Sequence, residues 1–169
     1  MRWLLVSMGL LVCAARLAAA GALGPGDRLP AFSVTAWDGT RMTQADVAGK
    51  PVVVDFWASW CVTCRTALPA IDAMAGRLRD RGVVVLAVNV DRDRSAADAW
   101  LAQRMPERHL RLVHDPEGAF LARCGASGMP AAYVVDQGGV VRFAEAGYAP
   151  DRVSAIERAV ESLLAPPSP

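Results

Sequence analysis

The feature that most constrains this chain of 169 residues is a pair of cysteines between a predicted strand and a predicted helix. The stretch Val52–Phe56 is rich in β-branched and aromatic residues, which is typical of a buried central strand. The cysteines follow in Trp60–Cys64, whose sequence is WCVTC. After Cys64, apolar residues recur at the spacing of a helix, at Leu68, Ile71, Met74, Ala75 and Leu78. A strand that leads into two cysteines at a helix start is typical of a thiol–disulfide redox site.

The position of Cys61 in the first turn of the predicted helix favours its thiolate form. Unpaired backbone N–H groups and the positive end of the helix dipole lie there. Each unit by which the thiol pKa falls corresponds to about 1.4 kcal/mol of preferential stabilisation of the thiolate. The thiolate is the nucleophile in disulfide exchange. We therefore expect Cys61 to attack a disulfide and Cys64, one helical turn later, to attack the mixed disulfide and release the product.

Other interpretations of the two cysteines are two structural thiols, a static disulfide, or half of a zinc site. Zinc needs two further ligands, and the nearest histidines are His109 and His114, with 44 residues between Cys64 and His109. A zinc finger has about 12 to 15 residues in that interval. We therefore expect no metal ligands among these residues, and no nucleotide, haem or metal cofactor is indicated.

The N-terminal residues have the composition of a targeting segment. Arg2 precedes the apolar stretch Trp3–Ala15, and the small residues Ala18–Gly21 that follow suit cleavage by signal peptidase. We predict that residues 1–20 are a signal peptide or an uncleaved N-terminal membrane anchor, because no other segment is long and apolar enough to span a membrane. A lipid anchor on Cys13 fits less well, since a bulky residue precedes it. The protein is therefore expected to be exported.

The rest of the chain has the length of one domain. Residues 25–165 contain enough apolar residues for a single core, and residues 166–169 are expected to form a disordered tail. Without Arg2 and Arg16, 16 basic residues face 17 acidic residues, which gives a net charge of −1. A nearly neutral chain gives no support for a nucleic-acid partner.

The remaining patterns predict an alternation of strands and helices. An Asp-Gly pair at 38–39 indicates the turn of a hairpin over 32–42, and the apolar run 83–90 indicates a second buried strand. The further predicted elements are helices over 95–105, 115–123 and 153–164, and two strands over 131–135 and 140–146. This order favours an α/β sandwich with a central mixed sheet.

Several short motifs together resemble the TlpA/ResA branch of thioredoxin-fold proteins, an exported branch that includes cytochrome c maturation reductases. The motifs are Leu29–Phe32, Gly49–Pro51, Phe56–Cys64, Pro69 and Gly128–Pro130. The resemblance implies a thioredoxin-like fold, with a central mixed β-sheet flanked by helices and an N-terminal β-hairpin extension. It also implies a thiol-disulfide oxidoreductase in the periplasm that reduces protein disulfides and is itself re-reduced by a membrane electron donor.

The resemblance further implies a substrate-binding surface beside the cysteines. Met129–Pro130 is expected to be a cis peptide that faces them, although cis bonds make up only about 5% of X-Pro bonds. Pro130 has no N–H group, and the backbone of Met129 would pair with an extended substrate segment. Trp60 is expected to cover the surface and to contact substrate. The alternative is that Pro130 only begins the strand over 131–135.

Asp55 is an acid inside a predicted buried strand, and the resemblance gives it a role. Thioredoxins have a buried acid at this position beneath the second cysteine, where desolvation raises the carboxyl pKa. Our hypothesis is that Asp55 accepts the proton of Cys64, through water, when Cys64 attacks the mixed disulfide. The alternative is an acid that is merely tolerated at a strand edge.

The chain departs from its relatives at two positions near the site. Many related proteins have an acid three residues after the second cysteine or directly after the cis proline, whereas this chain has Ala67 and Ala131 there. Both differences weaken an assignment to cytochrome c maturation but leave thiol–disulfide exchange intact. The pair Val62–Thr63 adds no charge near Cys61, so we expect a moderately reducing couple.

Two other functions remain open from the sequence. A thiol peroxidase would have a threonine three residues before its reactive cysteine, and this chain has Ala58 there. A copper chaperone would use Cys61 and Cys64 with a ligand such as Met129 or His114. Related copper proteins space their cysteines one residue wider and place a histidine near the end of the chain, but no histidine follows His114.

Cys124 is the remaining thiol of the predicted domain. It lies six residues before Pro130, so it could approach the active-site face as a sensing or dimer-forming thiol. The interpretation that we favour is a buried, unreactive cysteine that packs as a small apolar residue.

Overall fold

The computed structural model describes residues 21–166. The predicted signal peptide or anchor at 1–20 lies outside the described residues, as do residues 167–169 of the predicted tail. Within residues 21–166, none of the helices combines the length and apolar character needed to cross a membrane.

Seven strands form one mixed sheet in the order β2-β1-β5-β4-β3-β6-β7. Strands β3, β4 and β5 run parallel to one another, and the other neighbours pair antiparallel. The bounds are β1 Ser33–Ala36, β2 Arg41–Thr43, β3 Val52–Trp57, β4 Val84–Asn89, β5 Arg111–His114, β6 Ala131–Val135 and β7 Val141–Ala146. The predicted α/β class with a central mixed sheet and an N-terminal hairpin is confirmed. The hairpin turn contains Gly39 at φ +90°, a conformation that favours glycine.

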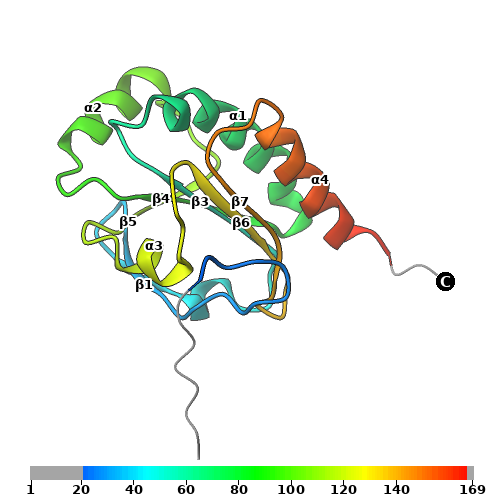
Figure 1. Cartoon of the computed structure of the whole chain (residues 1–169). Helices are drawn as coiled ribbons and strands as arrows, with labels where there is room; N and C mark the ends of the chain where they lie inside the picture. The colour runs from blue at the N-terminus through cyan, green and yellow to red at the C-terminus, as the bar shows by residue number, and fades with distance from the viewer. Residues whose placement is uncertain (1–20, 167–169) are drawn as a thin grey trace, which may run out of the picture.

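The helices cover both faces of the sheet (Figure 1). Helices α1 Val62–Leu78, α2 Ser95–Arg104 and α4 Arg152–Leu164 lie on one face, and the short helix α3 Ala119–Cys124 lies on the other. Two 3-10 turns, Gln44–Val47 and Arg79–Arg81, complete the elements. One apolar core joins the sheet to α1, α2 and α4, and a second joins it to α3 and the N-terminal segment.

Two elements differ from the sequence expectation. Strand β5 was not predicted, because its burial pattern places only Leu112 and Val113 in the interior and so offers too short a run to recognise. Helix α3 begins later than the predicted residue 115, since the Asp115 carboxylate accepts the N–H groups of residues 119, 120 and 121 and so caps the helix from outside. Gly118, at φ +63°, makes the turn between them.

The central strand β3 decides where the site lies. All six of its residues are buried, as predicted for a central strand. Successive side chains of a strand point to opposite faces. Val53 and Trp57 belong to the core under α1 and α4, whereas Val54 and Phe56 belong to the other core. Asp55 therefore points to the face that α1 and α4 cover, the face on which both cysteines lie.

Candidate active site

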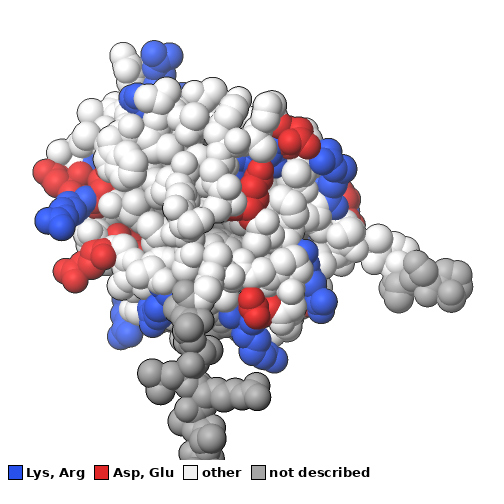
Figure 2. Space-filling view, viewed as in Figure 1, with Lys and Arg blue, Asp and Glu red and all other residues white. Residues whose placement is uncertain are grey.

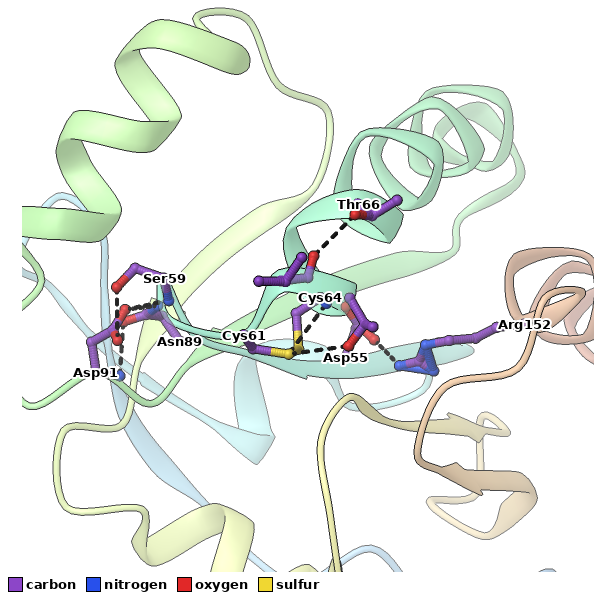
Figure 3. The surroundings of a disulfide bond; sticks show 10 residues. Asp55, Ser59, Cys61, Cys64, Thr66, Asn89, Asp91 and Arg152 are labelled. Atoms are coloured by element: carbon purple, nitrogen blue, oxygen red, sulfur yellow. Dashed lines mark hydrogen bonds and ion pairs between the residues drawn. A yellow bond between two sulfur atoms is a disulfide. The ribbon is translucent and has the colours of Figure 1, made fainter.

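Cys61 and Cys64 form a disulfide at the start of α1 (Figure 3). Cys61 is the N-cap residue, one position before the helix, and the amide of Cys64 donates a hydrogen bond of 3.2 Å to the Cys61 sulfur. The Thr63 hydroxyl lies 3.5 Å from the same sulfur. Cys61 is 7% exposed and Cys64 only 2%, so Cys61 is the sulfur that an incoming thiol or disulfide reaches. Donors aimed at this sulfur stabilise its thiolate after reduction.

The loop before Cys61 is held by a carboxylate from the neighbouring strand. Asp91, two residues beyond β4, is buried and accepts hydrogen bonds from the Ser59 amide at 2.9 Å and the Ser59 hydroxyl at 3.1 Å. The side-chain amide of Asn89 donates to the same carboxylate at 2.8 Å. The sequence analysis missed the pair Asn89 and Asp91. Its only signal was two polar residues at the end of a buried strand that runs parallel to β3.

Two exposed apolar side chains flank Cys61, and a third lies on the loop after β7. The large apolar residues that are exposed within 21–166 are Trp60, Val62 and Tyr148, at 66%, 65% and 58%. Trp60 and Val62 flank Cys61 in sequence. Met129–Pro130 is a cis peptide, as the resemblance predicted, and the Gly147 amide donates to the Pro130 carbonyl at 2.8 Å. That bond brings the loop carrying Tyr148, a residue the sequence analysis missed, beside the proline.

Charged side chains are sparse in the middle of this face. Over the loop that precedes β6, the surface in Figure 2 is uncharged, and most charged groups lie toward its rim. An uncharged surface of this kind suits contact with a partner protein.

Asp55 is buried and is paired with an arginine that the sequence analysis did not identify. Its side chain accepts a hydrogen bond from Arg152, the first residue of α4, and both side chains are almost fully buried. Burial raises the pKa of the Asp55 carboxyl, and the guanidinium of Arg152 opposes part of that rise. In the view of Figure 3, Asp55 is drawn between the disulfide and Arg152. No local sequence pattern signalled the pairing, because the two residues are 97 positions apart.

Cys124 lies in the core on the other face of the sheet. It is fully buried, and burial raises the pKa of its thiol to about 12. The Tyr133 hydroxyl donates to its backbone carbonyl at 3.2 Å. The interpretation of Cys124 as a buried thiol is confirmed, and the structure does not bring it to the active-site surface.

The two histidines have separate surroundings. The His109 amide donates to Asp72 at 2.7 Å, and a ring nitrogen of His114 lies 2.6 Å from the Asp91 carbonyl oxygen. Among residues 21–166, no group of three or more His, Cys, Asp or Glu side chains is arranged to hold a metal ion.

Comparisons with known proteins identify the family of this chain. The Redoxin family model matches residues 24–160. A thiol:disulfide interchange protein DsbE of Pseudomonas fluorescens biotype C is 35% identical over 118 residues, which cover 69% of this chain and 64% of that protein. This chain therefore spans less than two thirds of that relative. A DsbE protein of Pseudomonas aeruginosa is 32% identical over 130 residues, which cover 76% of this chain and 69% of that protein.

Solved structures of related proteins share this fold. A Chlorobium tepidum protein, assigned as a thiol:disulfide interchange protein DsbE, superimposes with a TM-score of 0.78 at 31% identity, over 85% of this chain and all of that chain. The Mycobacterium tuberculosis protein AhpC superimposes at 0.68 with 22% identity, over 83% of this chain and 94% of that one, and it shares the fold alone. The chain belongs to the Redoxin family. Its similarity to thiol:disulfide interchange proteins and its disulfide at the helix start support thiol–disulfide oxidoreductase activity.

Proposed function

We propose that this protein reduces disulfides of exported proteins through a Cys61/Cys64 dithiol–disulfide cycle. The observation that carries the proposal is the Cys61 sulfur at the N-cap of α1, which accepts the Cys64 amide and is the more exposed of the two. This arrangement stabilises one thiolate and keeps the second sulfur in reserve.

The cycle transfers two electrons to the substrate. The Cys61 thiolate attacks one sulfur of a substrate disulfide, and the other substrate sulfur leaves as a thiolate. The Cys64 thiolate then attacks the Cys61 sulfur, which forms the Cys61–Cys64 disulfide and releases the second substrate thiolate. A donor of two electrons, which we place in the membrane, restores the dithiol.

The substrate would bind across Trp60, Met129 and Pro130. Trp60 and Tyr148 are the exposed aromatic side chains beside the site, and aromatic groups contribute strongly to protein contacts. An extended substrate segment would run along the Met129 backbone, as the resemblance implies. The disulfide would then be presented to Cys61.

Asp55 would accept the Cys64 proton before the second attack. Its burial and its position on the cysteine face support this role. A general base contributes about 100-fold or more to a proton-transfer step. The variant Asp55→Asn should therefore slow resolution of the mixed disulfide while leaving the first attack near the wild-type rate.

The reduction potential tests the proposed function. Redox titration of Trp fluorescence against glutathione and dithiothreitol should give a reversible two-electron transition. A reduction potential of about −270 mV supports a reductase. A potential of about −120 mV would show that the protein is an oxidant instead. The Cys61→Ser variant should lose the transition and the Cys124→Ala variant should keep it. Absence of any transition in the wild-type protein would contradict redox chemistry.

A further inference from the structure

Two acids and one arginine form a row across the sheet under α4. Strand register places Asp55 of β3 opposite Ala132 of β6, and Ala132 opposite Glu145 of β7. Neighbouring strands are about 4.8 Å apart, so two strand spacings separate the acid backbones by about 10 Å. The small side chain of Ala132 between them leaves space for the guanidinium of Arg152, which contacts both acids.

The contacts of Arg152 are unequal. Its Nη2 atom donates a hydrogen bond to Asp55 Oδ1, whereas its Nη1 atom lies 3.7 Å from Glu145 Oε2. That separation is too long for a hydrogen bond but allows an ion pair. Within the described residues, both Nη1 and Glu145 Oε2 are buried without a hydrogen-bond partner. The two unpartnered atoms therefore face each other across a gap that a small side-chain movement would close.

Burial makes a carboxylate partner necessary for this arginine at all times. The Arg152 side chain is only 2% exposed, and an isolated buried charge is strongly unfavourable. If Asp55 becomes neutral by taking a proton, the remaining negative group beside Arg152 is Glu145, whose side chain is 18% exposed. Glu145 is therefore the second carboxylate within reach of the guanidinium.

We propose that Arg152 is a positioning residue that exchanges its hydrogen bond between Asp55 and Glu145 as Asp55 takes up and releases the proton of Cys64. This inference rests on the proposed role of Asp55 as the proton acceptor. The exchange keeps Arg152 paired in both protonation states of Asp55.

The step balances in protons and charge. In the mixed disulfide, the Cys64 thiol gives its proton to Asp55, and the Cys64 thiolate attacks the Cys61 sulfur. The bond between the cysteines forms, and the bond to the substrate sulfur breaks with its electron pair leaving on that sulfur. Arg152 bonds to Glu145 until Asp55 passes its proton to solvent. The net charge of the two acids and the arginine rises from −1 to 0 and then returns.

The titratable groups that face Asp55 come from three elements. Arg152 of α4 and Glu145 of β7 act on the Asp55 carboxyl, and Figure 3 draws Cys61 and Cys64, at the start of α1, on its other side. The cross-strand neighbours of Asp55 on β4 and β6 are both alanines and cannot titrate. The negative charge of Glu145 raises the pKa of the Asp55 carboxyl, and the positive charge of Arg152 lowers it.

Removing the charge of Glu145 and removing the charge of Arg152 should therefore shift the pH profile of attack by Cys64 in opposite directions. Reduced protein is mixed with dithiobis(nitrobenzoate) in a stopped-flow instrument, and release of the second thionitrobenzoate reports attack by Cys64. The rising limb of that rate with pH reports ionisation of Asp55. Glu145→Gln should shift the limb to lower pH and Arg152→Met to higher pH, each by about half a pH unit or more. Shifts in the same direction, or no shift, would overturn the inference.

Two further variants guard against a merely structural effect. Arg152→Lys keeps the positive charge, so its limb should lie between those of the wild type and Arg152→Met. Glu157→Gln on the same helix removes a carboxylate that pairs with Arg77 at 2.8 Å in an exposed setting, and it should leave the limb in place. Carbon NMR of the Asp55 carboxyl in the reduced protein gives the same pKa without any turnover.

The variant Asp55→Asn separates failure of the inference from failure of the proposed function. If the rising limb in Asp55→Asn keeps its wild-type position, Asp55 is not the acceptor and the proposed role fails. If the limb moves to higher pH in Asp55→Asn but stays in place in Glu145→Gln and Arg152→Met, only the exchange by Arg152 fails.

Discussion

Cys61 and Cys124 lie at opposite ends of two helices, and the difference explains their different chemistry. Cys61 caps the N-terminus of α1, where the Cys64 amide donates to its sulfur. Cys124 is the last residue of α3, is fully buried, and has a thiol pKa raised to about 12. The dipole favours negative charge at the first position and disfavours it at the second. The helix end and the burial of a cysteine therefore set its reactivity.

The segment that carries each of these cysteines is held by an aspartate that follows a parallel strand. Asp91 follows β4 and holds Ser59 in the loop before Cys61. Asp115 follows β5 and accepts three backbone N–H groups at the start of α3, the helix that ends at Cys124. An aspartate thus holds the loop before the reactive Cys61, and another aspartate holds the start of the helix that ends at the buried Cys124.

The largest expected effect separates the two cysteines by activity. Cys61→Ser should lower reduction of a protein disulfide by about 1000-fold or more, because it removes the nucleophile. Cys124→Ala should stay within about two-fold of wild type. The assay follows substrate reduction with dithiothreitol as electron source. Comparable losses in both variants would break the contrast between the two helix ends.

The next effect compares the two acids by stability. Asp91→Ala leaves the buried amide of Asn89 and the partly buried donors of Ser59 without their partner, and it should cost about 2 kcal/mol of unfolding free energy. Asp115→Ala removes a helix cap and should cost about 1 kcal/mol. Urea unfolding measures both. Only Asp91→Ala should also change the rate at which iodoacetamide labels Cys61, and an equal change in Asp115→Ala would contradict separate roles.

A smaller effect is the pH dependence of stability that Asp55 confers. Because the folded pKa of Asp55 is raised, its contribution to stability is complete below the unfolded value of about 3.9 and is lost as pH rises through the folded value. Carboxyls whose pKa is lowered, such as those of Asp38 and Asp136, finish titrating below about pH 5. The unfolding free energy of the oxidised protein should therefore decline as pH rises from about 3.9, relative to Asp55→Asn.

Unfolding is measured on the oxidised protein because disulfide-bonded cysteines do not titrate. A wild-type curve parallel to that of Asp55→Asn across this interval would show that burial does not raise the carboxyl pKa.

The smallest expected effect is at Cys124. Its raised thiol pKa and full burial should leave it unlabelled by iodoacetamide at pH 8 in the folded protein. Peptide mapping by mass spectrometry after labelling of the reduced protein should find modified Cys61 and unmodified Cys124. Labelling of both at similar rates would remove the distinction between the two sites.

Local patterns in the sequence determined the reactive motif and most of the fold. The strand Val52–Phe56, the two cysteines and the apolar helix stripe are each contained within a few residues, so spacing alone identifies them. The hairpin before Gly49 was predicted from its Asp-Gly turn, and the cis peptide Met129–Pro130 was predicted through short motifs that resemble a known family. Strand β5 was missed because its apolar run is only two residues long.

The tertiary structure alone decided which groups surround the reactive sulfurs. Asp91 reaches Ser59 across 32 positions, and Arg152 reaches Asp55 across 97. These residues come together only when β4 pairs beside β3 and when α4 packs against β6 and β7. A hydrogen bond or ion pair depends on separations of a few ångströms, which follow from strand order and helix packing. The sequence therefore determined that this chain has a redox pair, and the packing of distant elements decided the charges around it.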